Sequence, residues 1–551
     1  MTNLDFRRRN VIILVGKPCS GKSTLANSLA ECLGGTHISV GALIRLARES
    51  NMRFRQITEE AYDGRAMFEP NLLADLIADV IDAKKIQSGP LIIDAAPPID
   101  RVAAHLGWIS PLLIELKMSW QLAEQRRAAR VGETNHREDD NVELFRRRGR
   151  WCVEHLPETI AGFPTGTRHV RINANFSRSD TLRQALSYIL LTISEDWLQN
   201  VGGIKYLNEG SGNNSFSETK GILDRALQEH GGRPVGLTFI NQGEPSSSRN
   251  RLVLLLKPGL HFPDDIIARV ERLIASHGYK IRVIAAWDGT AVADSMVGRA
   301  HLDLAYLHAR WPEHLGFGQR MSKGLERDRT FVGGYSYGEH FGFKRLDEIW
   351  NEDGDHPPIK VGPCAYVIPA PDFTTPSDTF IVNGHIPSFL STLEDRGNVT
   401  YAIAIEAVSV TASSWLEMRN KFIGTTIPGR AAIGSLRRMA FDGELDIIGE
   451  ISFRNNGFHL SAGPLEAVRE FYLWFGYEEC KIFLRTLGIN TDQPLVNIPL
   501  EGEEYATLWL NEATECLDVE SRQLRTVLSR IDLSKEDTTS LRKMECDFSN
   551  D

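Results

Sequence analysis

Short apolar runs alternate with longer amphipathic stretches over the first 190 residues of the chain. The apolar run Val11–Val15 comes first and leads into a helix-like stretch at 25–33. Further apolar runs follow at 91–93, 112–116 and 169–172, with helical patterns between them. Such alternation is typical of a parallel sheet covered by helices. The pattern therefore predicts an α/β domain over residues 1–190.

A second core is predicted to begin at about residue 250. A buried strand is followed there by an amphipathic helix and then by another strand. Between the two cores, patches rich in Gly, Ser and Asn flank a single helical piece, so we expect a linker over 191–249. Beyond the second core, helical patches that end in polar residues predict a helical appendage over 477–551.

Composition and charge limit the class of protein. A chain of 551 residues is too long for one core, and its 42% hydrophobic and 24% charged residues are ordinary for a globular protein. The net charge of −10 argues against a protein that coats nucleic acid. No apolar run approaches the ~20 residues of a membrane span, and the start of the chain does not resemble a signal sequence. We therefore expect a cytoplasmic protein with no nucleic-acid or membrane partner, in which seven scattered cysteines stay reduced.

The first apolar run is followed by GKPCSGKST, a match to the phosphate-binding pattern G-x-x-x-x-G-K-[ST]. Its glycines let successive backbone N–H groups curl around a polyphosphate at the N-terminus of the next helix. The predicted nucleotide-binding residues here are Gly16, Lys17, Pro18, Cys19, Ser20, Gly21, Lys22, Ser23 and Thr24. We expect Lys22 to reach the β- and γ-phosphates and Ser23 to ligate Mg²⁺. Asp94, which ends the strand LIID, is a second candidate for holding Mg²⁺, with a strand-end turn as its alternative role.

A polar, turn-rich segment later in the chain contains four candidate arginines, Arg126, Arg130, Arg137 and Arg148. Guanidinium groups that close over a transferring phosphoryl group neutralise its charge and exclude water. Solvated helix faces are also rich in arginine, so this segment alone does not decide between the two roles.

Together these motifs resemble the adenylate kinase family of nucleoside monophosphate kinases, in its short-lid form, over residues 10 to about 185. The resemblance rests on the loop, HISVGALIR at 37–45, the strand LIID and the segment GETNHREDDN. It implies ATP as the phosphoryl donor and Mg²⁺ as the cofactor. It also implies that Arg126 stacks on the donor adenine and that Arg45 binds the acceptor phosphate. By the same resemblance Arg130, Arg137 and Arg148 contact the transferring phosphates, and Asp139 and Asp140 help to hold the lid.

The acceptor half departs from that family. Val40, Gly41 and Ala42 replace its Thr-Gly-Asp turn, and residues 94–98 read DAAPP where the family has D-G-F-P-R. A second phosphate-binding arginine is thereby lost, with Arg101 as a candidate substitute, and Val102 stands where a glutamine reads the base. Losing one bidentate arginine contact costs on the order of 1.5 to 3 kcal/mol. These departures argue against AMP as the acceptor.

A histidine at the end of the second core is the other chemical candidate. His459 lies in RNNGFHLSAGPLEAVREFYLWF, ahead of a predicted helix that contains Glu470. A histidine oriented by a carboxylate can act as a nucleophile toward phosphorus, because one ring nitrogen attacks while the other is held as a donor. Taken alone, a single histidine is more often structural.

Residues from about 250 to 476 resemble the nucleoside diphosphate kinase family, most clearly at GTTIPGRAAIGSLRRMAF and at the histidine segment. The resemblance implies an α+β, ferredoxin-like domain with His459 as the phosphohistidine. It implies that Lys257, Thr426, Arg437 and Asn456 bind nucleotide and that Ser461 and Glu470 orient the histidine. The family's G-S-D-S becomes Leu460, Ser461, Ala462 and Gly463, and a large insertion is expected near 308–400. That insertion is either a ligand-reading or oligomerising loop or a surface elaboration.

The combined expectation is a fused nucleotide kinase. The first domain would phosphorylate a (deoxy)nucleoside monophosphate directly, and the second would phosphorylate nucleoside diphosphates through a phosphohistidine. Families similar to the second domain usually form homo-oligomers, so we expect one here. The altered acceptor site leaves two alternatives, a nucleotide-sensing regulatory or antiviral protein with little turnover and a kinase with a non-nucleotide acceptor.

Overall fold

The computed structural model describes residues 11–63, 65–84, 89–95, 98–108, 110–131, 141–164, 167–207, 216–238, 251–318, 329–350, 358–362, 364–373, 378–408, 412–461 and 464–486. The chain divides into two compact units, with a boundary between Tyr188 and Ile189. Each unit has its own sheet and its own buried core.

The first unit contains a five-stranded sheet in which every neighbouring pair of strands is parallel. The strand order is β2 (Thr36–Ser39), β3 (Leu91–Asp94), β1 (Val11–Val15), β4 (Leu112–Lys117) and β5 (Arg168–Asn173). The predicted parallel α/β architecture is therefore confirmed for this unit. The carboxyl ends of the central strands β1 and β3 meet at one edge, which is where ligands bind in such sheets.

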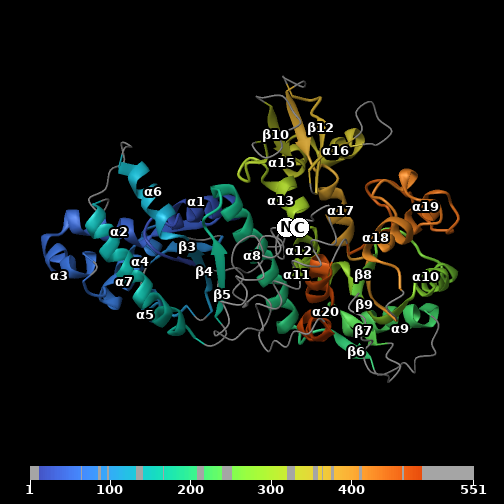
Figure 1. Cartoon of the computed structure of the whole chain (residues 1–551), viewed down its shortest axis with the longest axis horizontal. Coiled ribbons are helices and arrows are strands. Elements are labelled where there is room, and N and C mark those ends of the chain that lie inside the picture. The colour runs from blue at the N-terminus through green and yellow to red at the C-terminus, as the bar shows by residue number, and fades with distance from the viewer. Residues whose placement is uncertain are drawn as a thin grey trace, which may run out of the picture. The chain divides into compact units, whose positions relative to one another are not determined.

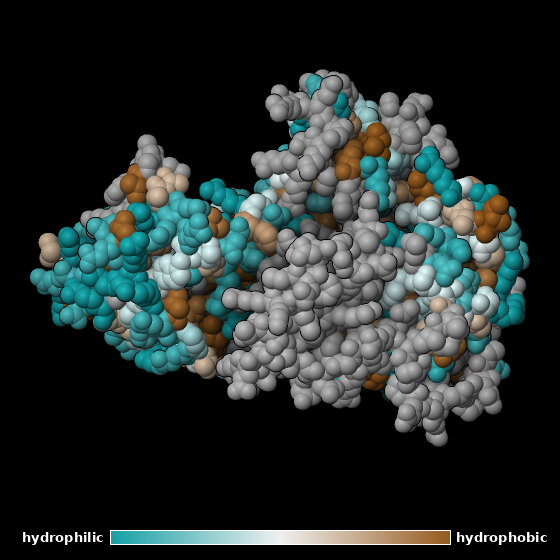
Figure 2. Space-filling view, viewed as in Figure 1, coloured by the Kyte–Doolittle hydropathy of each residue, from teal (hydrophilic) through white to brown (hydrophobic). Residues whose placement is uncertain are grey.

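Helices pack around this sheet (Figure 1). They are α1 (Lys22–Leu33), α2 (Val40–Ser50), α3 (Met52–Tyr62), α4 (Pro70–Lys84), α5 (Ile99–His105), α6 (Trp120–Val131) and α7 (Val142–Ala161). Helix α8 (Arg178–Asn200) begins in this unit and runs past the boundary at Tyr188. Apolar side chains from the strands and from α2, α4 and α5 form one continuous core, which includes Ile13, Ile93 and Leu113. The face of this unit visible in Figure 2 is mostly hydrophilic, with only scattered hydrophobic residues.

The second unit contains a six-stranded sheet. Its order is β15 (Phe458–Leu460), β8 (Arg251–Leu256), β14 (Val399–Ala407), β9 (Tyr279–Asp288), β7 (Val235–Thr238) and β6 (Lys205–Leu207). Strand β14 runs antiparallel to both β8 and β9, so β8 and β9 point the same way with β14 between them. Helix α10 (Asp264–Ser276) connects β8 to β9, and α20 (Pro464–Thr486) packs against β8.

The segment expected to be a linker is mostly folded. Strand β6, helix α9 (Phe216–His230) and strand β7 fall within 191–249, and both strands extend the six-stranded sheet. Residues 208–215 and 239–249, which contain the Gly/Ser/Asn-rich patches, lie outside the described residues. The linker prediction is therefore wrong for 205–207 and 216–238, because these short elements bury apolar side chains such as Leu223 and Val235.

The segment expected as an insertion at 308–400 forms a small sheet of its own, part of which is visible in Figure 1 as β10 and β12. The order is β10 (Thr330–Gly333), β13 (Thr379–Val382), β12 (Ala365–Pro369) and β11 (Ile359–Gly362). One face packs on Phe317, and the other packs on Tyr337 and Trp350 from α15 (Gly334–Phe341) and the end of α16 (Phe343–Ile349).

The remaining helices of the second unit are short. They comprise α11 (Gly289–Ser295), α12 (Val297–Leu302), α13 (Leu304–Arg310), α17 (Ile386–Leu393), α18 (Trp415–Glu417), the π-helical turn Met418–Ile423, the 3₁₀ turn Pro428–Arg430 and α19 (Leu436–Phe441). Helix α20 bends at Gly476 and continues to Thr486, so residues 477–486 belong to it, whereas the predicted patches at 506–516 and 521–531 lie outside the described residues. Among the described helices, none is both long and apolar enough to cross a membrane.

Candidate functional site

The loop between β1 and α1 has the backbone that its glycines predict. Gly16 and Gly21 have φ of 147° and 94°, and a Cβ at Gly16 would lie 2.8 Å from the carbonyl oxygen of Leu116. Both positions therefore require glycine. Cys19 also has a positive φ, 62°, which is uncommon for a residue with a side chain and keeps the loop tightly curled.

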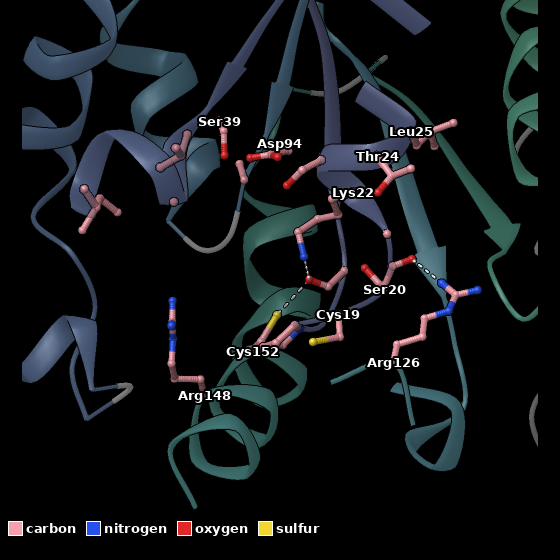
Figure 3. Close-up of a pocket in the computed structure, with 18 of the residues that line it drawn as sticks. Cys19, Ser20, Lys22, Thr24, Leu25, Ser39, Asp94, Arg126, Arg148 and Cys152 are labelled. Carbon is pink, nitrogen blue, oxygen red and sulfur yellow. Dashed lines mark hydrogen bonds between the residues drawn. The ribbon is translucent and has the colours of Figure 1, made fainter. Parts of the chain in front are cut away.

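Lys22 lies at the start of α1, and its ammonium group points back into the loop (Figure 3). Its Nζ donates hydrogen bonds to the carbonyl oxygens of Gly16, at 2.7 Å, and Lys17, at 2.9 Å. Burial lowers the pKa of Lys22. A buried ammonium group held by two carbonyl oxygens is well prepared for an anionic partner.

Asp94 ends β3 beside the loop and is almost completely buried. Burial alone would raise the pKa of this carboxyl group, but hydrogen bonds from His37, Ser23 and Ser39 outweigh burial and lower the pKa. The Nε2 atom of His37 lies 3.2 Å from the carboxylate. The carboxylate is thus kept ionised next to the Ser23 hydroxyl, and both groups are oxygen ligands of the type that Mg²⁺ prefers.

A cavity of about 560 Å³ opens above the loop. The sequence-predicted residues that line it are Gly16, Pro18, Cys19, Ser20, Gly21, Lys22, Ser23, Thr24, Arg45, Asp94, Arg126, Arg130 and Arg148. Lys17 does not line the cavity, because its ammonium group lies 4.5 Å from the ring centre of Trp120. Arg137, Asp139 and Asp140 fall outside the described residues.

Arginines approach the loop from two sides (Figure 3). Arg126, on α6, donates to the carbonyl oxygens of Ser20, at 3.5 Å, and Ala174, at 3.0 Å, so it is tied to the loop itself. Arg148, on α7 opposite, lies with its guanidinium carbon 5.1 Å from the ring centre of Tyr62. Arg178, which was not predicted from the sequence, also lines the cavity. The cavity is therefore strongly positive around the loop.

The side of the cavity where the sequence predicts the acceptor is largely apolar among the described residues. Val40, Ile44, Phe68 and Leu73 line it, together with Ser39 and Arg45. The suggested substitute Arg101 is not among the lining residues; its side chain is 57% exposed and lies 3.8 Å from Glu158. That suggestion is therefore wrong, because α5 turns Arg101 toward solvent while Val102 enters the core.

In the second unit, the structure gathers the residues predicted around His459. The His459 Nε2 atom lies 2.5 Å from Oε1 of Glu470, and the Ser461 hydroxyl donates to Oε2 of the same carboxyl group at 2.5 Å. Strand β15 presents His459 and α20 presents Glu470. The other ring nitrogen of His459, Nδ1, takes no part in this hydrogen bond.

Cationic and amide groups surround this pair. Lys257 donates to Oδ1 of Asn456 at 2.8 Å, and Asn456 in turn donates to the carbonyl oxygen of Thr426 at 3.0 Å. Arg437 donates to the carbonyl oxygen of Phe458, the residue before His459, at 3.0 Å. Residues that are almost 200 positions apart in the sequence thus meet at one place.

Burial shifts the protonation of this cluster. It lowers the pKa of His459 to about 4 and that of Lys257 to about 7, and it raises the pKa of Glu470 to about 8. Glu466 opposes this lowering of the His459 pKa, whereas Lys257 and Arg437 add to it. The imidazole is therefore neutral at physiological pH, as a nucleophile must be.

Sequence reasoning missed several residues of this second cluster. His301 on α12 lies with Nδ1 3.3 Å from Oε1 of Glu470, and the ring of Phe389 lies 4.7 Å from the Lys257 ammonium group. Tyr366 hydrogen-bonds to Thr426 through its side chain. No local motif marks these residues in the sequence, and only the packing of α12, α17 and β12 against the site identifies them.

Comparison with known proteins places the first unit in a class. A family model described as an AAA domain matches residues 15–146, which run from the end of β1 into α7. The chain is also similar to the adenylate kinase of Brucella abortus (strain S19), at 26% identity over 174 residues, 29% of this chain and 88% of the relative. The adenylate kinase of Porphyromonas gingivalis (strain ATCC BAA-308 / W83) is 27% identical over 143 residues, 25% of this chain and 73% of the relative. The first unit is therefore an adenylate kinase-like P-loop domain, while the resemblance of the second unit to nucleoside diphosphate kinases stays a prediction.

Proposed function

We propose that the first unit is an ATP-dependent kinase that transfers the γ-phosphoryl group to a (deoxy)nucleoside monophosphate. The observation that carries the proposal is the cavity in which Lys22, Ser23, Asp94 and several arginines surround one phosphate-binding loop. The similarity to adenylate kinases supports the same reaction class.

The residues of the cavity have different roles in phosphoryl transfer. Backbone N–H groups of the loop and Lys22 hold the β- and γ-phosphates, while Arg130 and Arg148 neutralise charge on the group in transit. Ser23 and Asp94 would hold Mg²⁺, which neutralises charge on the phosphates when bound with ATP. The acceptor oxygen attacks the γ-phosphorus in line, and ADP leaves as the bond to the bridging oxygen breaks.

Among the described residues, the acceptor half of the cavity offers apolar contacts, Ser39 and Arg45, but no glutamine that could read the adenine base of AMP. The contacts by which the adenylate kinase family holds AMP, a base-reading glutamine and a second phosphate-binding arginine, are replaced here by Val102 and Pro98. We therefore propose an acceptor other than AMP, held by its phosphate at Arg45.

A second activity is supported by the cluster around His459. We propose that Nδ1 of His459 attacks the γ-phosphorus of a nucleoside triphosphate, releasing the diphosphate, and that a second nucleoside diphosphate then takes the phosphoryl group from Nδ1. Glu470 holds Nε2 and stabilises the positive charge that develops on the ring. The order β15, β8, β14, β9, with β14 antiparallel between two parallel strands, supports a ferredoxin-like sheet.

A nucleotide-sensing regulatory or antiviral protein is the alternative function. The apolar acceptor half favours it, since ATP could bind without a second substrate in place. The expected homo-oligomer stays a prediction under either function.

The test uses γ-labelled ATP with a panel of nucleoside mono- and diphosphates. Lys22→Ala should abolish labelled diphosphates formed from monophosphates, and His459→Ala should abolish an acid-labile label on the protein. Lys117→Ala is the matched control for the first variant, because Lys117 is half-exposed and pairs with Glu115 at 2.7 Å. His340→Ala is the control for the second.

Each activity can fail separately. If the Lys22→Ala variant still forms labelled diphosphates from monophosphates, the first proposal is wrong. If the His459→Ala variant still carries an acid-labile label, the second proposal is wrong. Binding of ATP with no product and no label for any acceptor would favour the sensing protein.

A further inference from the structure

Two imidazoles and one carboxylate converge in the second unit in an arrangement that phosphoryl transfer does not explain. Oε1 of Glu470 is 2.5 Å from Nε2 of His459 and 3.3 Å from Nδ1 of His301. The two imidazole rings are perpendicular, with centres 4.7 Å apart. One ligand atom from each of the three residues lies within 4.8 Å of the other two. A nucleophilic histidine needs only one orienting partner, so His301 is left without a role.

The three side chains are held firmly in place. Glu470 is 2% exposed and His301 8%, whereas His459 is 20% exposed and gives the cluster its open side. Ser461 fixes the second oxygen of Glu470. Each ligand comes from a different element, namely α12, β15 and α20. Preorganisation of this kind is what a metal site requires of its ligands.

Two nearby cationic side chains have partners of their own. Arg469 is paired with Asp303 at 2.9 Å, and Lys257 donates to Asn456.

We propose that His301, His459 and Glu470 form a binding site for a zinc-class divalent cation. Two histidines and one glutamate are a recurrent ligand set of zinc sites with an open fourth position. Ligand distances of about 2.0–2.2 Å place neighbouring ligand atoms roughly 3.3 Å apart in a tetrahedral site. The pair formed by His301 and Glu470 already has this spacing, while His459 must move away from Glu470 by about 1 Å.

The ion would replace two hydrogen bonds. One is the bond between His459 and Glu470, and the other is the contact of the Trp474 indole N–H with Nδ1 of His301, at 3.3 Å. Coordination to zinc is much stronger than a single hydrogen bond, so binding can displace both. The proposal does not depend on phosphoryl transfer at His459, and it is tested without measuring activity.

The test is a titration of the full-length protein, stripped with EDTA and desalted, with Co²⁺ as a spectroscopic stand-in for zinc. We expect one equivalent of Co²⁺ to give the visible absorption of a low-coordinate nitrogen and oxygen site, and Zn²⁺ to abolish it. His301→Gln should weaken binding of this equivalent at least tenfold. His340→Gln, which changes an exposed histidine, should leave it unchanged.

Two further measurements keep the result interpretable. Near-ultraviolet circular dichroism shows whether His301→Gln is folded, and Glu470→Gln provides a second variant that should also lose the cobalt signal. Wild-type protein that gives no such absorption would overturn the proposal. An absorption that both variants retain would overturn it as well, because the ion would then bind elsewhere, for example at cysteines.

Discussion

Arg146 and Arg148 lie on the same helix, α7, but face different surroundings. Arg148 lines the cavity above the phosphate-binding loop, whereas Arg146 is 58% exposed and pairs with Glu124 at 2.7 Å. A surface ion pair of this kind contributes little to stability or function. The two residues therefore form a natural pair of test and control.

We predict that Arg148→Ala lowers kcat for ATP-dependent transfer by about a hundredfold, because a cation that stabilises the phosphoryl group in transit is lost. Arg146→Ala should change kcat by less than about twofold. Steady-state kinetics with the best acceptor from the panel measures both. Equal losses in the two variants would mean that Arg148 does not act on the reacting phosphate.

Residues of the site differ in how far the sequence could predict them. Lys22 and Ser23 follow from a contiguous motif, because the loop and the helix start next to each other. His301 could not be predicted, since its partner Glu470 is 169 positions away and no local pattern marks it. Arg101 shows the opposite error, because a charged residue near the right position in the sequence points to solvent in the fold.

At the scale of elements, the start of α11 contacts the turn that precedes β14. A Cβ at Gly289 would lie 1.8 Å from the backbone carbonyl oxygen of Asp395, and Gly289 N–H donates to the carbonyl oxygen of Asn398. Backbone atoms on both sides leave little room for adjustment. This contact fixes how α11 and the following α12 leave the sheet.

We predict that Gly289→Ala destabilises the second unit by about 3 kcal/mol, because overpacking against a backbone cannot be relieved by a rotamer change. Gly221→Ala is the matched control, since the nearest atom to its Cβ is the flexible Arg225 side chain at 3.7 Å. That change lies within α9 and should raise stability by up to about 1 kcal/mol. Thermal unfolding followed by circular dichroism distinguishes the two, and an unchanged melting temperature for Gly289→Ala would contradict the packing described.

Strands within the alternating strand and helix pattern of the first unit were predictable, whereas two strands within a linker-like composition were not. The strands at 91–93, 112–116 and 169–172 all occur, each extended by a residue or more. In contrast β6 has three residues and β7 has four, and flanking Gly/Ser-rich patches gave the whole region the composition of a linker. Strands this short obtain their stability from neighbouring strands rather than from their own sequence, so pattern alone does not identify them.

At the scale of the whole molecule, histidines with shifted protonation are concentrated in the second unit. Burial lowers the pKa of His459 to about 4 and of His385 to about 3, and it lowers the pKa of His301 well below its ordinary value of 6.5. A histidine with a depressed pKa stabilises the fold above its unfolded pKa of about 6.5, and this stabilisation is lost as the pH falls toward the folded value. Glu470, with its pKa raised to about 8, acts in the opposite sense and gains stability as the pH falls toward its unfolded pKa.

We predict that the second unit loses stability between pH 6.5 and pH 5, because three histidines outweigh one glutamate in this window. Differential scanning calorimetry should show this as an unfolding transition that moves to lower temperature by several degrees. His385→Asn should reduce the dependence on pH. A transition that stays constant or moves upward over this range would contradict the burial of these side chains.

The cysteines beside the phosphate-binding loop offer a way to read ligand occupancy that needs no catalysis. Cys19 lines the cavity, while burial raises the pKa of the other four described cysteines and so suppresses their reactive thiolate form. Among the five described cysteines, a small alkylating reagent should therefore modify Cys19 first. Cys19→Ser identifies its signal, and saturating ATP should slow the reaction at Cys19 at least tenfold. If ATP protects Cys19 but is not turned over, the protein is a nucleotide receptor. If ATP protects Cys19 and is turned over, the protein is an enzyme. Alkylation of Cys19 therefore reports whether the phosphate-binding loop holds a nucleotide.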